Sequence, residues 1–121
     1  MTTITLPFPP SVNTYWRQFR GRAILSAKAR LYRKQVHVCC GAQAIDKMEG
    51  RLSMLIELHP PDRRRRDVDN YSKGILDALC HAGVYDDDEQ IDDQRVVRRA
   101  REDGGRAVVT VTQNQEESSP R

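Results

Sequence analysis

Residues 63–73 bring together, in one short stretch, the side chains that phosphodiester cleavage requires. The stretch reads RRRRDVDNYSK, four arginines followed by two aspartates and a lysine. Asp67 and Asp69 are two positions apart, so in an extended segment both carboxylates point to one side and could hold one divalent cation. Lys73 follows four residues after Asp69. The arginines can bind the phosphate backbone, the aspartates can hold a metal ion, and the lysine can stabilise negative charge as it develops on the phosphate. This combination predicts a metal-dependent nuclease.

Simpler interpretations compete with this one. Aspartates before a helix often cap it or interact with its dipole, and Lys73 with Asp69 could form a surface ion pair worth a few tenths of a kcal/mol. An arginine run can also be a solvated edge or a localisation signal. The position of the aspartates directly after the arginines favours the metal site. In an extended run the arginines of residues 63–66 cannot all face DNA, so alternate members should turn toward acids such as Asp62.

Residues 86–93 supply candidates for a third metal ligand. The stretch contains no base and six acids: Asp86, Asp87, Asp88, Glu89, Asp92 and Asp93. Mutual repulsion raises carboxylate pKa values unless a cation offsets it. Such a run is also typical of a solvated loop that aids solubility. Spacing alone does not choose the ligand among the five aspartates.

A basic surface is expected beside this site. Residues 14–34 carry seven lysines and arginines and no acid, although the net charge of the 121-residue chain is only +3. A basic segment at residues 14–34 and an acidic one at residues 86–93 are typical of a protein that binds a polyanion next to a metal site. The aromatic rings of Tyr15, Trp16 and Phe19 could stack on opened nucleic acid or pack over the sheet. The side chains expected to contact DNA are Arg17, Arg20, Arg22, Arg30, Lys34, Arg63, Arg64, Arg65 and Arg66.

Other functional classes find little support in the sequence. Three cysteines form no C-x-x-C pair and three histidines are scattered, which indicates neither a disulfide framework nor a zinc site and favours a reducing, cytoplasmic setting. No apolar run approaches membrane-spanning length, and the N-terminus lacks the apolar core of a signal peptide. No glycine-rich phosphate loop or dinucleotide-binding fingerprint is present, so we expect no membrane partner and no small-molecule cofactor.

The hydrophobic pattern predicts a single small α+β domain over residues 1–112. Its order, β-α-β-α-β-β, gives a mixed sheet with two helices. Only 38% of residues are hydrophobic, a thin core that a homodimer would supplement. Alternating apolar residues place strands at 2–6, 51–58, 94–101 and 106–112.

Turn and capping residues set the remaining boundaries. Asp103, Gly104 and Gly105 predict that the last two strands form a hairpin. Residues 11–25 read as a loop, and one helix is expected from Ser26 to about residue 47. The second helix is expected from Asp67 to a stop at Gly83. Residues 113–121 are expected to be a disordered polar tail.

These residues resemble the RusA family of Holliday-junction resolvases, the small crossover-junction endodeoxyribonucleases of bacteria and their prophages. The resemblance covers nearly the whole chain and is strongest at PDRRRRDVDN, residues 61–70. It also includes TLPFPPS at residues 5–11 with Asn13 following, and RVV at residues 95–97. The resemblance implies a homodimer that binds a four-way DNA junction and, with Mg²⁺ or Mn²⁺ in its place, nicks two opposing strands symmetrically.

The resemblance also implies roles for individual residues. The metal-binding aspartates of the family match Asp67, Asp69 and Asp88, and its active-site lysine matches Lys73. Asp86 stands where the family usually has an apolar residue, and Gly74 replaces a better helix former, which implies a looser turn. Two rival hypotheses are a non-catalytic nucleic-acid-binding module and a metal nuclease acting on flaps, single strands or RNA.

Overall fold

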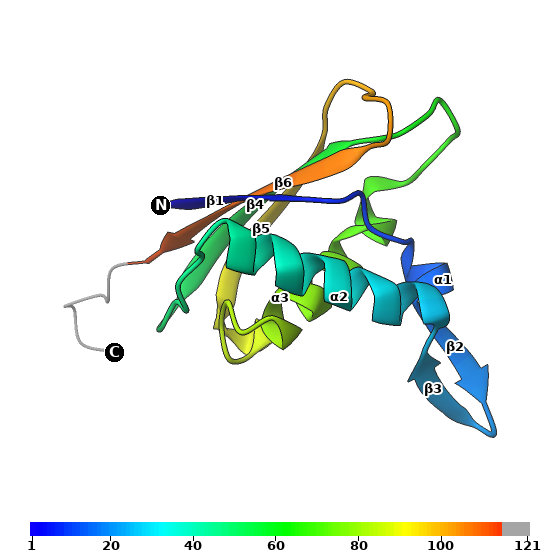
Figure 1. Ribbon diagram of the computed structural model, residues 1–121, viewed down its shortest axis with the longest axis horizontal. Coiled ribbons are helices and arrows are strands. Elements are labelled where there is room, and N and C mark those ends of the chain that lie inside the picture. Colours follow the sequence, from blue (N-terminus) through cyan, green and yellow to red (C-terminus); the bar gives the residue numbers. More distant parts are fainter. Residues whose placement is uncertain (115–121) are drawn as a thin grey trace.

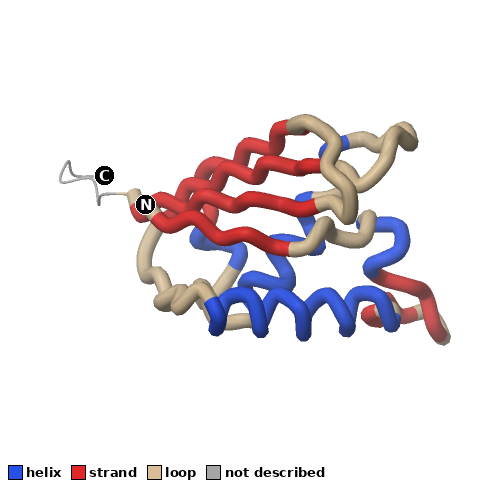
Figure 2. Tube along the Cα trace, turned by 45° about the horizontal axis from the view of Figure 1, so that its top comes forward, coloured by secondary structure: helices blue, strands red, loops and turns tan. Residues whose placement is uncertain are grey.

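A four-stranded mixed β-sheet with helices on one face is the framework of the computed structural model, which describes residues 1–114 (Figures 1 and 2). The strands lie in the order β1-β6-β4-β5. Strand β6 is antiparallel to both of its neighbours, while β4 and β5 are parallel. The predicted α+β class and mixed sheet are therefore confirmed. The strands are β1 (Thr2–Leu6), β4 (Leu52–His59), β5 (Ile91–Arg98) and β6 (Arg106–Gln113).

The helical elements are more numerous than the two that the sequence predicted. Two of them are long, and the others are single turns at the ends of loops. No helix within residues 1–114 is long and apolar enough to span a bilayer. The helical elements are α1 (Val12–Tyr15), α2 (Ala27–Ala42), α3 (Ser72–His81) and the 3₁₀ turns η1 (Val68–Asn70) and η2 (Asp88–Gln90).

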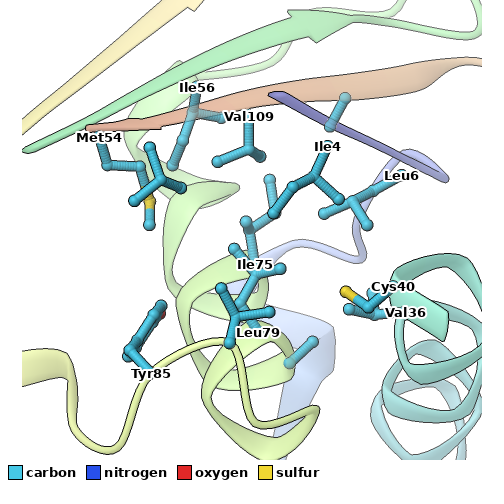
Figure 3. Close-up of a cluster of buried hydrophobic side chains, with 14 of the residues drawn as sticks. Ile4, Leu6, Val36, Cys40, Met54, Ile56, Ile75, Leu79, Tyr85 and Val109 are labelled. Carbon is cyan, nitrogen blue, oxygen red and sulfur yellow. The ribbon is translucent and has the colours of Figure 1, made fainter. Parts of the chain in front are cut away.

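The core lies between the sheet and the helices α2 and α3. Alternate residues of β4, from Leu52 to Leu58, are buried, and β6 shows the same period of two. Figure 3 shows Ile75 and Leu79 of α3 among the buried side chains of the strands and α2. Both are fully buried, and each such side chain contributes about 1.5–3 kcal/mol of transfer free energy. This packing fixes α3, the helix that carries Lys73.

Helix α2 begins as predicted but ends earlier. The Ser26 hydroxyl accepts a hydrogen bond from the Ala29 amide and caps the helix. The helix ends at Ala42 rather than near residue 47. Gln43 leaves the helix, and its side-chain amide bonds both the N–H and the C=O of Thr5 at the edge of β1. Satisfying that edge strand favours an early end to the helix.

The predicted hairpin of the last two strands is wrong. Strand β4 lies between β5 and β6, and the turn at residues 103–105 belongs to a longer connection between them. The reason is the difference in polarity between the two strands. Strand β6 buries Ala107, Val109 and Val111 and takes a central place, whereas β5 exposes most of its side chains and takes an edge.

Two further expectations also need correction. Helix α3 begins at Ser72 rather than at Asp67, because η1 comes before it. Residues 16–25, expected within a loop, form the two-stranded hairpin β2 (Trp16–Phe19) and β3 (Arg22–Leu25). Of the predicted tail, Gln113 belongs to β6, and residues 115–121 lie outside the described part of the chain.

Candidate nucleic-acid interface and metal site

Asp67, Asp69 and Lys73 lie in one short segment where the chain turns from the end of β4 toward α3. Asp67 precedes η1 in an extended conformation, Asp69 lies within η1, and Lys73 is in the first turn of α3. The extended geometry assumed for the pair therefore holds at Asp67 only. Asp67 makes no capping hydrogen bond to η1, and among residues 1–114 neither aspartate forms an ion pair with Lys73. Neither the side-chain cap nor the Asp69–Lys73 ion pair is therefore formed, whereas Asp69 does lie in the first turn of η1, where the helix dipole favours an acid.

Asp88 faces this segment from the acidic loop. It lies in η2, which packs against α3. Partial burial raises the pKa of Asp88, and the negative charges of Asp77 and Asp87 raise it further. The Tyr85 hydroxyl and the Lys73 ammonium lower it. The contact of η2 with α3 places the acidic loop against the helix that carries Lys73.

Other acids of the loop have structural partners. Asp86 pairs with Lys47 at 2.6 Å. Glu89 and Asp92 both pair with Arg51, at 2.9 and 2.6 Å, and the Arg51 guanidinium also donates to the Glu89 carbonyl. These exposed ion pairs add little free energy. They join the loop to the segment that precedes β4, and they give three of the six acids a structural partner.

The other three aspartates of this segment differ in position and in partners. The Asp87 side chain accepts from the Glu89 amide and forms a capping box with Gln90 that starts η2. Asp93 lies on β5 and lines a shallow depression with Ser53 and Thr110. Asp88 forms no ion pair and makes no capping hydrogen bond among the described residues, and it lies in η2, which contacts α3, the helix that carries Lys73. Its role as the third metal ligand stays a prediction.

Asp67, Asp69 and Asp88 have the donor chemistry of a magnesium site, because each offers carboxylate oxygens that are exposed to solvent. Within residues 1–114, however, no group of three or more acidic, histidine or cysteine side chains is arranged to hold a metal ion. The structure does not gather the three predicted ligands into a closed cage. Mg²⁺ commonly takes one or two protein carboxylates and completes its shell with water and substrate phosphate oxygens, and these residues fit such an open site.

The four arginines before Asp67 alternate as predicted. Arg64 and Arg66 both bond to Asp62, at 3.1 and 2.8 Å. The hydrogen bonds from Arg66 and then from Arg64 hold the pKa of Asp62 well below its usual range. Arg66 also lies 5.5 Å from the centre of the Phe8 ring, and the Arg98 guanidinium donates to its carbonyl. The side chains of Arg64 and Arg66 therefore hold this loop in shape.

Arg63 and Arg65 are exposed. Arg65 borders an open depression of about 290 Å³ that reaches Asp67. Sequence reasoning singled out neither Ser11 nor Asn13 as a site residue, yet both line this depression. The signal that could have found them is the PPS-x-N pattern at residues 9–13. The depression is lined by Ser11, Asn13, Arg65, Arg66, Asp67, Asn70 and Tyr71.

Asp77, one turn after Lys73 on α3, joins the site to the rest of the molecule. Arg33 of α2 donates to both of its carboxylate oxygens at 2.8 Å, and the Tyr15 hydroxyl donates to Oδ2 at 2.5 Å. Tyr15 is fully buried. Sequence reasoning gave neither Asp77 nor Arg33 a role in the site, because their pairing connects separate helices.

Gly74 has a packing role that the sequence did not predict. A Cβ atom at this position would lie 2.9 Å from Cδ2 and 3.0 Å from Cε2 of Tyr15. Glycine therefore allows the Tyr15 ring to lie directly against the first turn of α3. The close approach of this ring explains why a residue with a Cβ atom is absent here.

The other predicted DNA contacts lie on the β2–β3 hairpin and on α2. Arg17, Arg20 and Arg22 are exposed on the hairpin, and Lys34 is exposed on α2. Arg30 is also exposed, but its guanidinium donates to the Leu25 carbonyl at 2.9 Å and fastens the hairpin. The predicted basic surface is present on these elements.

The fold and these side chains define a small α+β nucleic-acid-processing domain, with carboxylates and a lysine beside a basic depression. Residues 7–112 match the family model described as Endodeoxyribonuclease RusA. The chain therefore belongs to the RusA family of endodeoxyribonucleases, and it is a nuclease, as the sequence predicted.

Curated relatives agree with this assignment over nearly the whole chain. A protein of Enterobacteria phage HK97 named crossover junction endodeoxyribonuclease rusA is 44% identical over 109 residues, 89% of this chain and 91% of its own. The protein of the same name from Enterobacteria phage 82 is 44% identical over 111 residues, 91% and 92% of the two chains. The Escherichia coli K12 protein RusA is 44% identical over 112 residues, 92% and 93% of the two chains.

Proposed function

We propose that the protein is a Mg²⁺-dependent endonuclease that resolves four-way DNA junctions by paired symmetric nicks, acting as a homodimer in the cytoplasm during recombination and repair. Support comes first from the relatives, which are named crossover junction endodeoxyribonucleases and match about nine-tenths of the chain. The structural observation that carries the proposal is the placement of Asp67, Asp69 and Lys73 along one short segment that leads into α3, beside a depression lined by Asp67 and Arg65.

The roles of the side chains follow from their chemistry and position. Asp67, Asp69 and Asp88 would hold the cation, and Mn²⁺ could replace Mg²⁺ because both accept oxygen ligands. A bound Mg²⁺ supplies Lewis acidity at the scissile phosphate and favours attack by water. The Lys73 ammonium offers three donors for the phosphate oxygens as negative charge develops.

The depression beside Asp67 would position the DNA backbone. Arg65 offers a planar guanidinium, which binds phosphate oxygens in pairs. The hydroxyl of Ser11 and the amide of Asn13 line the same depression and can donate to a phosphate. These contacts carry no sequence information, and they set the register of the backbone against the carboxylates. Any preference for particular bases at the cut would therefore depend on contacts other than these.

A dimer suits the proposed substrate. A four-way junction offers two equivalent strands, and a two-fold symmetric protein presents two identical sites in matching positions. The exposed cations of the hairpin and of residues 63–66 would then act in two copies. Paired nicks would follow from this symmetry, because each protomer cuts one strand.

The experiment that tests the proposal compares three labelled substrates: a synthetic four-way junction, a linear duplex and a single strand. Each is incubated with the protein in Mg²⁺ or in EDTA, and the products are separated on a denaturing gel. We expect paired nicks in the junction alone, and only with Mg²⁺. Binding without nicking would support a non-catalytic module instead, and equal cutting of all three substrates would point to a less selective nuclease.

A further inference from the structure

The β2–β3 hairpin projects from the body of the molecule as a separate two-stranded arm (Figures 1 and 2). Its strands pair from Trp16 with Leu25 at the root to Phe19 with Arg22 at the tip. Arg20 and Gly21 turn the chain with φ values of 51° and 74°. Positive φ at both turn positions is the geometry that matches the twist of a tight hairpin.

The root of the arm is fixed to the body on both strands. The Trp16 ring packs against the buried Tyr15 ring with centres 4.4 Å apart. The Ser26 amide donates to the Tyr15 carbonyl at 2.9 Å, and Arg30 donates to the Leu25 carbonyl at 2.9 Å. The arm is therefore held in a defined direction relative to the helices.

Of the three aromatic residues in this segment, Phe19 alone presents its ring to solvent. Tyr15 belongs to the core and Trp16 is half-buried, whereas Phe19 is 49% exposed. The guanidinium carbons of Arg17 and Arg20 lie 5.8 and 5.3 Å from the centre of its ring, within the range of cation–π attraction. The arm thus ends in an apolar ring flanked by cations.

The positive charge around the Phe19 ring indicates an anionic partner. The first acidic residue of the chain is Asp46, so no carboxylate in residues 1–45 offsets the arginines of the arm. A cationic surface with an exposed ring is the chemistry that binds a phosphate backbone and an unstacked base. In a linear duplex both faces of each internal base are stacked, whereas a branch point interrupts the stack.

The arm also lies close to the depression beside Asp67. Asn13 of α1 lines that depression, and β2 begins at Trp16, directly after α1 ends. One short helix therefore connects the backbone-binding depression with the arm. DNA held at the depression would be within reach of the arm.

We propose that Phe19 stacks on an unstacked base at the branch point of the DNA substrate, with Arg17 and Arg20 on the flanking phosphates. This inference rests on the proposed function and deepens it, because it assigns to one side chain a preference for branched over linear DNA. Base–aromatic stacking is worth roughly 1–3 kcal/mol per base. Loss of the ring should therefore weaken junction binding by roughly 5- to 150-fold and affect duplex binding much less.

The test compares wild type with Phe19→Ala, Phe19→Leu and Phe19→Trp. Affinities for a four-way junction and a linear duplex are measured in EDTA, where no cleavage occurs. A second readout is the fluorescence of 2-aminopurine placed at the branch point or within one arm of the junction. Leu31→Ala is the matched control, because Leu31 is 56% exposed on α2 and carries the same kind of apolar loss.

We expect Phe19→Ala and Phe19→Leu to lose the junction preference and the fluorescence change at the branch point, and Phe19→Trp to retain both. An unchanged ratio of junction to duplex affinity in Phe19→Ala, from a wild-type protein that nicks junctions selectively, would overturn this inference and leave the proposed function standing. A wild-type protein that neither prefers nor nicks junctions would overturn both. The slope of affinity against salt should be the same in all five proteins, because no charge changes.

Discussion

DNA affinity should fall steeply as salt rises, by an amount that the structure allows us to work out. Three of the nine cations predicted to contact DNA are engaged internally: Arg64 and Arg66 with Asp62, and Arg30 with a backbone carbonyl. Six phosphate contacts per protomer give a slope of log affinity against log salt near −5. Of the nine predicted contacts, the six that are exposed and form no ion pair within residues 1–114 are Arg17, Arg20, Arg22, Lys34, Arg63 and Arg65.

Replacing Arg17, Arg20 and Arg22 by glutamine removes half of these six contacts. The slope should therefore fall to about half of the wild-type value. This ratio does not depend on how many protomers bind the DNA, because every protomer loses the same share. The assay is fluorescence anisotropy of a labelled four-way junction in EDTA, at salt concentrations between about 50 and 200 mM.

A matched control changes three arginines that are already paired with acids. Its slope should stay close to that of wild type, since an ion-paired guanidinium releases few counterions from DNA. An unaltered slope in the hairpin variant, or an equal loss in the control, would refute the assignment of the hairpin as a phosphate-binding surface. The control replaces Arg99, Arg101 and Arg106, the partners of Glu57, Asp103 and Glu102.

Further predictions concern the metal ligands and the packing of α3. Asp69→Asn should abolish nicking on a denaturing gel while junction affinity stays equal or rises, because one negative charge beside the phosphates is lost; undiminished nicking would remove Asp69 from the site. Gly41→Ala should raise the free energy of unfolding by up to about 1 kcal/mol, since nothing lies within 4 Å of the added carbon. Gly74→Ala should lower it by about 1–2 kcal/mol in urea denaturation, because overpacking against the buried Tyr15 ring outweighs the helix gain; equal stabilisation of both variants would contradict this packing. Burial raises the pKa of Asp77, but hydrogen bonds from Arg33 and Tyr15 outweigh burial and lower this pKa overall. The ionised Asp77 carboxylate therefore stabilises the fold fully above the usual carboxyl pKa of about 4. This stabilisation is lost as the pH falls through the lowered pKa. Asp77→Asn should therefore reduce the acid dependence of unfolding below about pH 4, and an identical pH profile would argue against this network.

The sheet was largely predictable because strand periodicity is a local property. Leu52 to Leu58 alternate with a period of two, and so do Ala107 to Val111, and both segments are strands with one buried face. The pairing of strands was not predictable in the same way. Gly104 and Gly105 signal a turn, but the polar strand β5 takes the edge while β6 takes the centre. Polarity, rather than turn residues, decided the order.

The site was predictable only where neighbouring residues determine it. The alternation of residues 63–66 follows from the extended chain and from Asp62 next to it. The ion pairing of three other acids in this loop depends instead on Lys47 and Arg51, which lie about forty residues earlier in the chain. The role of Gly74 depends in the same way on Tyr15, a residue from the other end of the domain. Such long-range contacts leave no local pattern in the sequence.

Nicking of a labelled four-way junction by Asp88→Asn and Asp93→Asn tests the central claim most directly, because the two variants make the same charge change in the same acidic segment. Asp88 lies in η2, which contacts α3, the helix that carries Lys73, whereas Asp93 lies on the strand β5. At saturating Mg²⁺, Asp88→Asn should nick the junction at least about 100-fold more slowly than wild type while still binding it, and Asp93→Asn should nick at a wild-type rate. Normal nicking by Asp88→Asn, or equal losses in both variants, would contradict the proposed carboxylate site.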